Sequence, residues 1–165
     1  MLYLDTQFVF AYLVDSDPDH EAAARTADDL SIVHEAGRIS AFISVMVLDE
    51  VAWKLAGALY DARHGRGSWV RSNRHEAFAG VRELVADAID ALLEAPWLHI
   101  APADEDVSSV YASFMRRYHL LPADLAHLAV AHASGMDAIV THDADFHDLR
   151  NAPVRIVRYA SPEHR

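Results

Sequence analysis

Short apolar segments alternate with longer amphipathic segments along the whole chain, and this alternation limits the possible folds more than any other feature. Strands are expected at Met1–Leu4, Ile39–Ser44, Leu98–Ala101, Ala138–Thr141 and Val154–Val157. Helices are expected between them, because apolar residues there recur every three to four positions. Strands that alternate with helices need crossover connections, and these produce a mostly parallel sheet covered on both faces. The sequence therefore predicts an α/β fold.

The helices can be located from apolar spacing and from end signals such as a starting proline or a terminal glycine. They are predicted at Thr6–Val14, from Pro18 to about Ala36, at Val45–Tyr60, at Val81–Leu93, around Val107–Met115, and from Pro122 to about Ser134. The apolar stripe within 81–93 suits either the core or a dimer interface, and the sequence does not choose between them.

Length and composition exclude several classes of protein. A chain of 165 residues with 52% hydrophobic residues suits one globular domain, expected to span residues 1–165. The absence of cysteine excludes disulfides, thiolate zinc sites and iron–sulfur clusters. No membrane span or signal peptide is visible, so the cytoplasm is the expected location. A net charge of −11 gives no overall attraction to nucleic acid, which leaves a local basic patch or bridging metal ions.

Polar residues follow three of the predicted strands. Asp5 follows the first strand, Ser44 ends the second, and Thr141 to Asp143 lie at the end of the fourth. In open α/β sheets, sites form outside the carboxyl ends of the strands. We therefore expect these polar residues to meet at one edge of the sheet.

Several carboxylates are expected at the same edge. They are Asp5, Glu50, Asp124, Asp143 and Asp145. Like charges that lie close together raise one another's pKa unless a cation neutralises them. A cluster of oxygen ligands suits hard cations such as Mg²⁺ or Mn²⁺, and such an ion activates water and polarises phosphoryl oxygens. The pattern indicates phosphodiester hydrolysis.

Each acidic residue also has a simpler interpretation. Asp5 suits a helix N-cap. Glu50 and Lys54 are four residues apart and suit an exposed helical ion pair. Asp124 would complement a helix dipole, and Asp143 or Asp145 would suit a turn. The functional interpretation depends on the order and placement of the acidic residues as a set.

Three segments resemble PIN domains, and most closely the VapC-type toxin ribonucleases. They are LDTQ at the start, ISVMVLDE in the first third, and LPADLAHLAVAHASGMDAIVTHDADF near the end. The family pattern maps onto Asp5-Thr6, Ser44 to Glu50, Asp124, and Thr141-x-Asp143. The last segment is the most specific, and the resemblance spans the whole chain in order.

The resemblance implies a three-layer α/β/α sandwich and an endoribonuclease that depends on Mg²⁺ or Mn²⁺. Asp5 and Asp124 would be the principal metal ligands, with Glu50 and Asp143 completing the site. Asp145 would contact these ligands without binding the metal itself. Side chains expected to hydrogen-bond the carboxylates or the substrate phosphate are those of Thr6, Ser44 and Thr141.

The resemblance also implies partners: an RNA substrate, a second copy of the chain, and a small protein antitoxin that blocks the acidic cleft. Two alternatives stay open. One is a PIN nuclease that processes RNA outside toxin systems, and the other is a non-catalytic binding module with a PIN-like fold. Four mutually repelling carboxylates argue against the second alternative.

A basic segment around residues 61–75 departs from the usual length of such toxins. It is expected to be a loop or helical insertion, with candidate RNA-binding residues Arg63, Arg66, Trp69, Arg71 and Arg74. Arginine clamps phosphate and tryptophan stacks on bases. A flexible surface excursion or a dimer contact is the alternative interpretation.

The eleven histidines suggest a competing metal site, but their spacing does not favour one. His127 and His132 are five residues apart, about 140° around a helix. His142 and Asp143 form a dyad that fits poorly after a strand. We expect most histidines to be packing or surface residues, and His142 to lie near the substrate without binding metal.

Overall fold

A computed structural model describes residues 1–159, so residues 160–165 of the predicted domain lie outside the described residues. The sheet is formed by β1 (Leu2–Leu4), β2 (Ala41–Ile43), β3 (Leu98–Ile100), β4 (Ala138–Val140) and β5 (Arg155–Val157). All four strand pairings are parallel, and the strand order is β3-β2-β1-β4-β5. The predicted parallel sheet is therefore confirmed.

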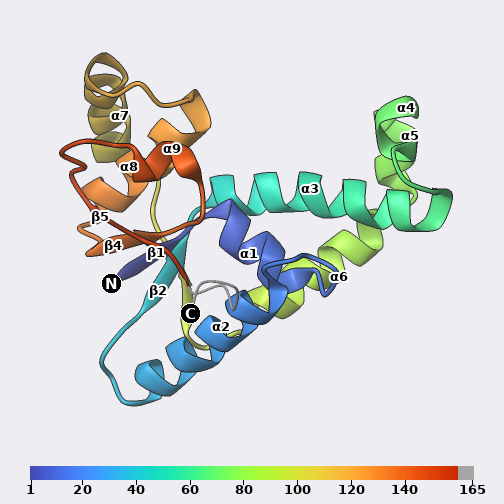
Figure 1. The fold of residues 1–165 in the computed structure, drawn as a ribbon, viewed down its shortest axis with the longest axis horizontal. Coiled ribbons are helices and arrows are strands. Elements are labelled where there is room, and N and C mark those ends of the chain that lie inside the picture. Colours follow the sequence, from blue (N-terminus) through green and yellow to red (C-terminus); the bar gives the residue numbers. More distant parts are fainter. Residues whose placement is uncertain (160–165) are drawn as a thin grey trace.

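Helices cover both faces of this sheet. They are α1 (Thr6–Leu13), α2 (His20–Glu35), α3 (Val45–His64), α4 (Ser68–Arg71), α5 (Arg74–Ala79), α6 (Arg82–Leu93), α7 (Glu105–Arg117), α8 (Pro122–Ala133) and α9 (Ala144–His147). Figure 1 shows α7 and α8 on one side of the sheet and α1 and α2 on the other. The fold is the three-layer α/β/α sandwich that the resemblance implies.

The main core lies between the sheet and these helices. Its strands read as short apolar runs because parallel strands are buried on both faces, and β4 is buried at every position. Fully buried side chains include Tyr3, Leu4, Phe8, Ile43 and Leu128. Within the described residues, no helix is long and apolar enough to cross a membrane.

Helix α3 extends beyond the sheet and carries a second, smaller core. It has 20 residues and is about 30 Å long, and α4 and α5 pack at its far end before α6 returns to the sheet (Figure 1). We call residues 55–85 the helical arm. Its core contains Leu55, Ala56, Trp69, Ala77, Val81 and Val85. The stripe expected within 81–93 thus supplies core residues, while Leu84 is 38% exposed.

The predicted insertion around 61–75 is mostly helical. It comprises the end of α3, all of α4 and the start of α5. Asp61 holds the turn between α3 and α4, because its carboxylate accepts hydrogen bonds from the backbone N–H groups of Gly67 and Trp69, both at 2.7 Å. These backbone bonds hold the pKa of Asp61 below its usual value.

Candidate active site

The strand order changes direction between β1 and β4, and the candidate site lies there. The chain passes from β1 to β2 and β3 on one side, and then crosses to β4 and β5 on the other. Ligands of open α/β sheets bind at such a reversal. Because Leu4 is in register with Val140, the next residues of both strands, Asp5 and Thr141, emerge together at the carboxyl edge.

Asp5 is both a helix cap and a member of the site. One carboxylate oxygen accepts the backbone N–H of Phe8 at 2.9 Å, which caps α1. The other oxygen accepts a hydrogen bond from the Thr141 hydroxyl. Burial raises the pKa of Asp5, while the bonds from Thr141 and Phe8 oppose that rise. The N-cap interpretation and the site interpretation are therefore compatible.

Glu50 lies in the second turn of α3, and its carboxylate contacts side chains of α1 and α8. Its Oε2 accepts a hydrogen bond from the Thr6 hydroxyl at 2.5 Å and lies 3.4 Å from Nε2 of His127. The hydrogen bond with His127 is the largest cause that lowers the pKa of Glu50 to about 2, and Lys54 adds the smallest contribution. Glu50 is thus held as a carboxylate by groups from two other elements rather than by the expected pair with Lys54.

Asp124 lies in the first turn of α8 and is partly buried. Burial raises the pKa of Asp124 to about 6, and the charge of Asp143 adds to the rise. Asp145 and Glu50 act in the same direction more weakly, while His127 opposes them. Shifts in this direction are expected where carboxylates from α3, α8 and α9 share one edge of the sheet.

Asp143 combines a turn role with a place beside the site. It caps the short helix α9 by accepting the backbone N–H of Asp145 at 2.8 Å. Its other oxygen accepts a hydrogen bond from the Gln7 amide at 3.1 Å. The Thr141 hydroxyl, which donates to Asp5, also accepts the backbone N–H of Asp143 at 2.9 Å. One buried hydroxyl therefore links the two carboxylate-bearing segments.

His127 is a site residue that the spacing argument missed. It is 3% exposed, and its Nδ1 lies 2.8 Å from the Tyr3 hydroxyl. That hydroxyl also lies 2.7 Å from the buried Ser44 hydroxyl. A buried chain of polar groups thus runs from Ser44 through Tyr3 and His127 to Glu50. The sequence could have indicated His127 as a site residue, because it follows Asp124 by three positions and so lies on the same face of a largely apolar helix.

His142 lies in the segment after β4, and its partners are Tyr159 and Asp19 rather than the carboxylates of the candidate site. Its ring stacks on Tyr159 at 3.7 Å between centroids, and its Nδ1 lies 3.3 Å from the Asp19 carboxylate. The structure therefore gives His142 a packing contact with Tyr159, and its expected place near the substrate stays a prediction. Among residues 1–159, no group of three or more His, Asp or Glu side chains is arranged closely enough to hold a metal ion as the structure stands.

The basic residues of 61–75 have varied surroundings. Trp69 is 7% exposed in the core of the helical arm. Arg63 donates to the Gly80 carbonyl at 3.1 Å, and Arg71 donates to the Arg66 carbonyl at 3.2 Å. The Arg74 guanidinium lies 5.3 Å from the ring centroids of both Trp53 and Trp69. The indole available to a ligand is therefore that of Trp53, which the sequence reasoning did not select.

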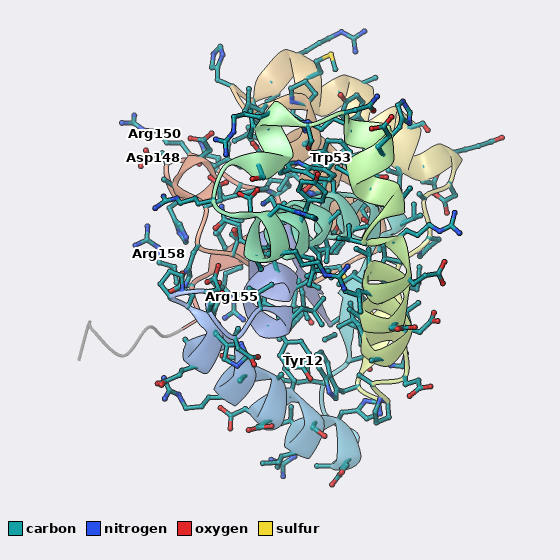
Figure 2. All side chains as sticks on the ribbon, turned by 90° about the vertical axis from the view of Figure 1, so that its right-hand side faces the viewer. Tyr12, Trp53, Asp148, Arg150, Arg155 and Arg158 are labelled. Atoms are coloured by element: carbon teal, nitrogen blue, oxygen red, sulfur yellow. The ribbon has the colours of Figure 1, made fainter. Side chains whose placement is uncertain are left out.

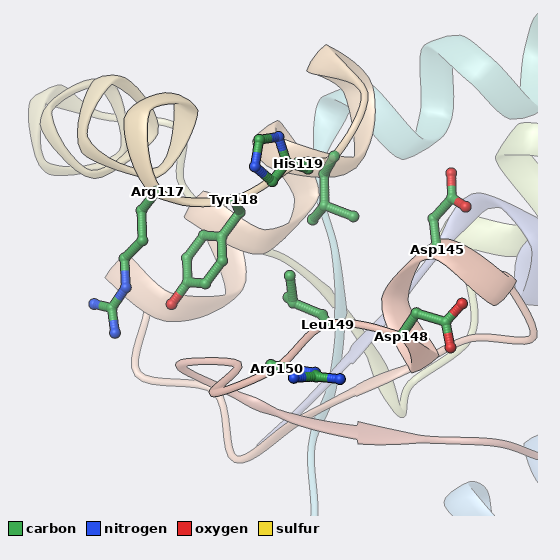
Figure 3. A pocket seen from close by; sticks show the side chains of 8 residues that line it. Arg117, Tyr118, His119, Asp145, Asp148, Leu149 and Arg150 are labelled. Atoms are coloured by element: carbon green, nitrogen blue, oxygen red, sulfur yellow. The ribbon is translucent and has the colours of Figure 1, made fainter.

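A cavity of about 390 Å³ adjoins the acidic edge at Asp145 (Figure 3). Arg117, Tyr118 and His119 line it from the end of α7, and Asp148 and Arg150 line it from the segment after α9. The Arg117 guanidinium lies 5.2 Å from the Tyr118 ring centroid. In a chain of charge −11, this cavity gathers two arginines, Arg117 and Arg150, in one place that also includes Asp145.

Solved structures that share the fold of this chain include the following three. VapBC2 from Rickettsia felis, bound to a DNA fragment from its promoter, matches with a TM-score of 0.63 and 14% identity over 97% of this chain and 100% of that chain. Mycobacterium tuberculosis VapC20, described as a Sarcin-Ricin loop cleaving toxin, has a TM-score of 0.55 and 19% identity over 89% and 93%. FitAcB from Neisseria gonorrhoeae has a TM-score of 0.54 and 18% identity over the full length of both chains.

The sequence was also compared with curated proteins and with models of protein families. No curated protein matches the chain in sequence. The model of the PIN domain family matches residues 2–152, which include every strand except β5 and all the acidic residues discussed above. The chain belongs to the PIN domain family.

Proposed function

We propose that this protein is an endoribonuclease that hydrolyses RNA phosphodiester bonds with Mg²⁺ or Mn²⁺ bound by Asp5, Glu50, Asp124 and Asp143. The observation that carries the proposal is the shared carboxyl edge of β1 and β4, where the buried Thr141 hydroxyl bonds both Asp5 and the backbone of Asp143, and α8 carries Asp124 in its first turn. A fold gains nothing from gathering like charges at a half-buried edge, and a bound divalent cation removes the cost.

The donor set fits a hard cation. All four proposed ligands are carboxylates, which Mg²⁺ and Mn²⁺ prefer. Mg²⁺ commonly binds through one or two carboxylates and keeps several waters. A bound ion would supply a Lewis acid for the phosphoryl oxygen and an activated water.

The protein's own groups would orient the site in distinct ways. Thr141 holds Asp5 and the start of α9, so that two of the proposed ligands keep a fixed separation. His127 and Thr6 hold Glu50 in its ionised form. Thr6, Ser44 and Asp145 remain proposed as supporting residues, and Arg117 and Arg150 would contact phosphates that flank the scissile bond.

We further propose that the protein is the toxin of a toxin–antitoxin pair, and that it acts as a homodimer in the cytoplasm. The support is its family and its likeness in fold to VapBC2, VapC20 and FitAcB. A small protein antitoxin would block the acidic cleft. Toxicity on expression in a bacterial host, relieved by co-expression of the adjacent short reading frame, is the expected result. Sedimentation as a dimer would support the assembly.

Calorimetric titration with Mn²⁺ tests the proposed site without requiring the correct RNA. The wild-type protein should bind Mn²⁺, and Asp124→Asn should lose most of that binding. Asp87→Asn is the matched control, because Asp87 is an exposed acidic residue on α6. Equal Mn²⁺ binding by all three proteins would contradict the assignment of Asp124, and no binding by the wild type would contradict the metal site itself.

A further inference from the structure

Trp53 is an exposed aromatic residue beside the candidate active site. It lies on α3 and is 47% exposed, whereas most large aromatic side chains of this protein are buried. Glu50 precedes it by three residues, which places the two on the same side of α3 and about 4.5 Å apart along the helix axis. Whatever contacts Trp53 therefore lies next to a proposed metal ligand.

A cavity of about 330 Å³ opens at Trp53 between α3 and α5. It is lined by Asp49, Ala52, Trp53, Arg74, His75 and Phe78. Its volume lies at the lower end of the range for small-molecule sites. Figure 2 shows Trp53 on the face formed by these helices, away from Asp148 and Arg150, which mark the cavity on the other side of the acidic edge.

The aromatic and cationic groups of this cavity are fixed by the arm behind them. The Trp69 indole packs edge-to-face against Trp53 with 4.9 Å between centroids. Gly57 permits this packing, because a Cβ at that position would lie 3.2 Å from the Trp69 ring. The Arg74 guanidinium lies 5.3 Å from both indole centroids. Trp53 and Arg74 are therefore held in place before any ligand arrives.

We propose that this cavity binds one unstacked nucleotide of the RNA substrate, with the base against Trp53 and a phosphate against Arg74. The proposal rests on the proposed nuclease function and adds a substrate subsite to it. An aromatic platform binds the face of any base, and a guanidinium binds phosphate. The Asp49 carboxylate at the rim accepts hydrogen bonds from exocyclic amino groups such as that of cytosine.

The arrangement favours a nucleotide over a protein side chain, because Trp53 can stack on the base and Arg74 can bind the phosphate. A purely apolar partner would leave the Arg74 guanidinium without an anion to bind. The cavity also lies one helical turn from Glu50, so a strand whose phosphate reaches the carboxylates can place a nearby base on Trp53. A base inside a continuous duplex is stacked on its neighbours and cannot enter.

A comparison of two RNA probes of equal charge tests the subsite. One is a fluorescently labelled oligocytidylate, and the other is the same backbone with abasic riboses throughout. Binding is measured without divalent metal, so that cleavage does not interfere. The wild-type protein should prefer oligocytidylate, and Trp53→Leu should lose about tenfold in affinity for it while binding the abasic probe as before.

Matched variants separate stacking from folding. Trp53→Phe keeps an aromatic face and should keep most of the preference, and thermal unfolding verifies that both Trp53 variants fold. Arg74→Ala should weaken binding of both probes, because it removes a phosphate contact. Arg82→Ala is its control, since Arg82 lies on α6 and pairs with Glu83.

Three results would overturn the subsite. They are equal binding of the two probes by the wild type, an undiminished preference in Trp53→Leu, or unchanged RNA binding by Trp53→Leu together with a change in oligomeric state, which would mark a protein contact instead. The proposed function fails on a different readout, namely the absence of metal-dependent cleavage. Base-dependent binding that requires Trp53 would stand even then.

Discussion

His127 Nε2 lies 3.4 Å from Glu50 Oε2, and the opposite ring nitrogen lies 2.8 Å from the Tyr3 hydroxyl. The imidazole therefore joins the buried central strand to a carboxylate on α3. Its position on α8, one turn after Asp124, makes the same helix supply a proposed ligand and the group that orients another. Rigid support of this kind is what a carboxylate site needs for constant geometry.

Replacement of His127 by Gln should weaken the site without unfolding the protein. Glu50 loses the partner that contributes most to its low pKa, and the loss of an orienting partner typically costs 10–100-fold in metal affinity or activity. We expect a drop of about 10-fold or more in Mn²⁺ affinity, measured by calorimetry. His132→Gln, an exposed position on the same helix, should change nothing, and equal effects of the two variants would contradict a specific role for His127.

Asp124→Asn should stabilise the metal-free protein at neutral pH. A carboxyl whose pKa is raised to about 6 in the fold binds its proton more tightly there than in the unfolded chain, where the value is near 3.8. Its charge therefore destabilises the fold above about pH 6, and this penalty disappears as the pH falls towards 4. We expect a gain of about 1 kcal/mol, discounted for partial exposure, from denaturant unfolding. A gain of equal size at pH 4 would contradict the electrostatic cause.

Thr141→Val should destabilise the fold by removing a hydroxyl that serves two buried groups. The Thr141 hydroxyl is fully buried, donates to Asp5 and accepts the backbone N–H of Asp143. A buried group left without its partner costs about 1–3 kcal/mol. Thermal unfolding should show a correspondingly lower Tm. Thr26→Val is the control because the Thr26 hydroxyl only bonds its own helix, at Ala22, and an equal loss there would point to a general cost of replacing a hydroxyl with a methyl group rather than to the site.

Arg117→Ala and Arg150→Ala should weaken RNA binding and reduce its dependence on salt. Both residues line the cavity beside Asp145. Each lost phosphate contact on single-stranded RNA should lower the slope of log affinity against log salt by about 0.7. Arg25→Ala serves as the control, since Arg25 pairs with Glu21 on the distant helix α2. An unchanged slope in both variants would remove this cavity from the RNA path.

Much of the fold could be predicted because the signals were local. The alternation of apolar runs located all five strands, and Pro122 and Gly135 marked the two ends of α8. The helices α4, α5 and α9 have four to six residues each, which is too short for an apolar stripe to be recognised. In the sequence, these three segments appear only as polar or glycine-containing stretches.

The site was predicted in outline because parallel strands bring their carboxyl ends to one edge. That rule placed Asp5 and Thr141 together, and the register of β1 and β4 agrees with it. The rule does not predict contacts between side chains of different helices, so the contact of His127 on α8 with Glu50 on α3 was not predicted. Trp69 was selected over Trp53 because it lies among arginines in sequence, whereas burial inside the arm decides which indole is accessible. The roles of the four carboxylates as metal ligands stay a prediction.

Cleavage of labelled RNA tests the central claim most directly. A mixed set of single-stranded RNAs and tRNAs would be incubated with wild-type protein in Mn²⁺, with EDTA added in parallel, and with Asp124→Asn. We predict cleavage by the wild type that EDTA and Asp124→Asn both abolish. Cleavage that survives in Asp124→Asn, or that continues in EDTA, would contradict a metal-dependent nuclease centred on Asp124.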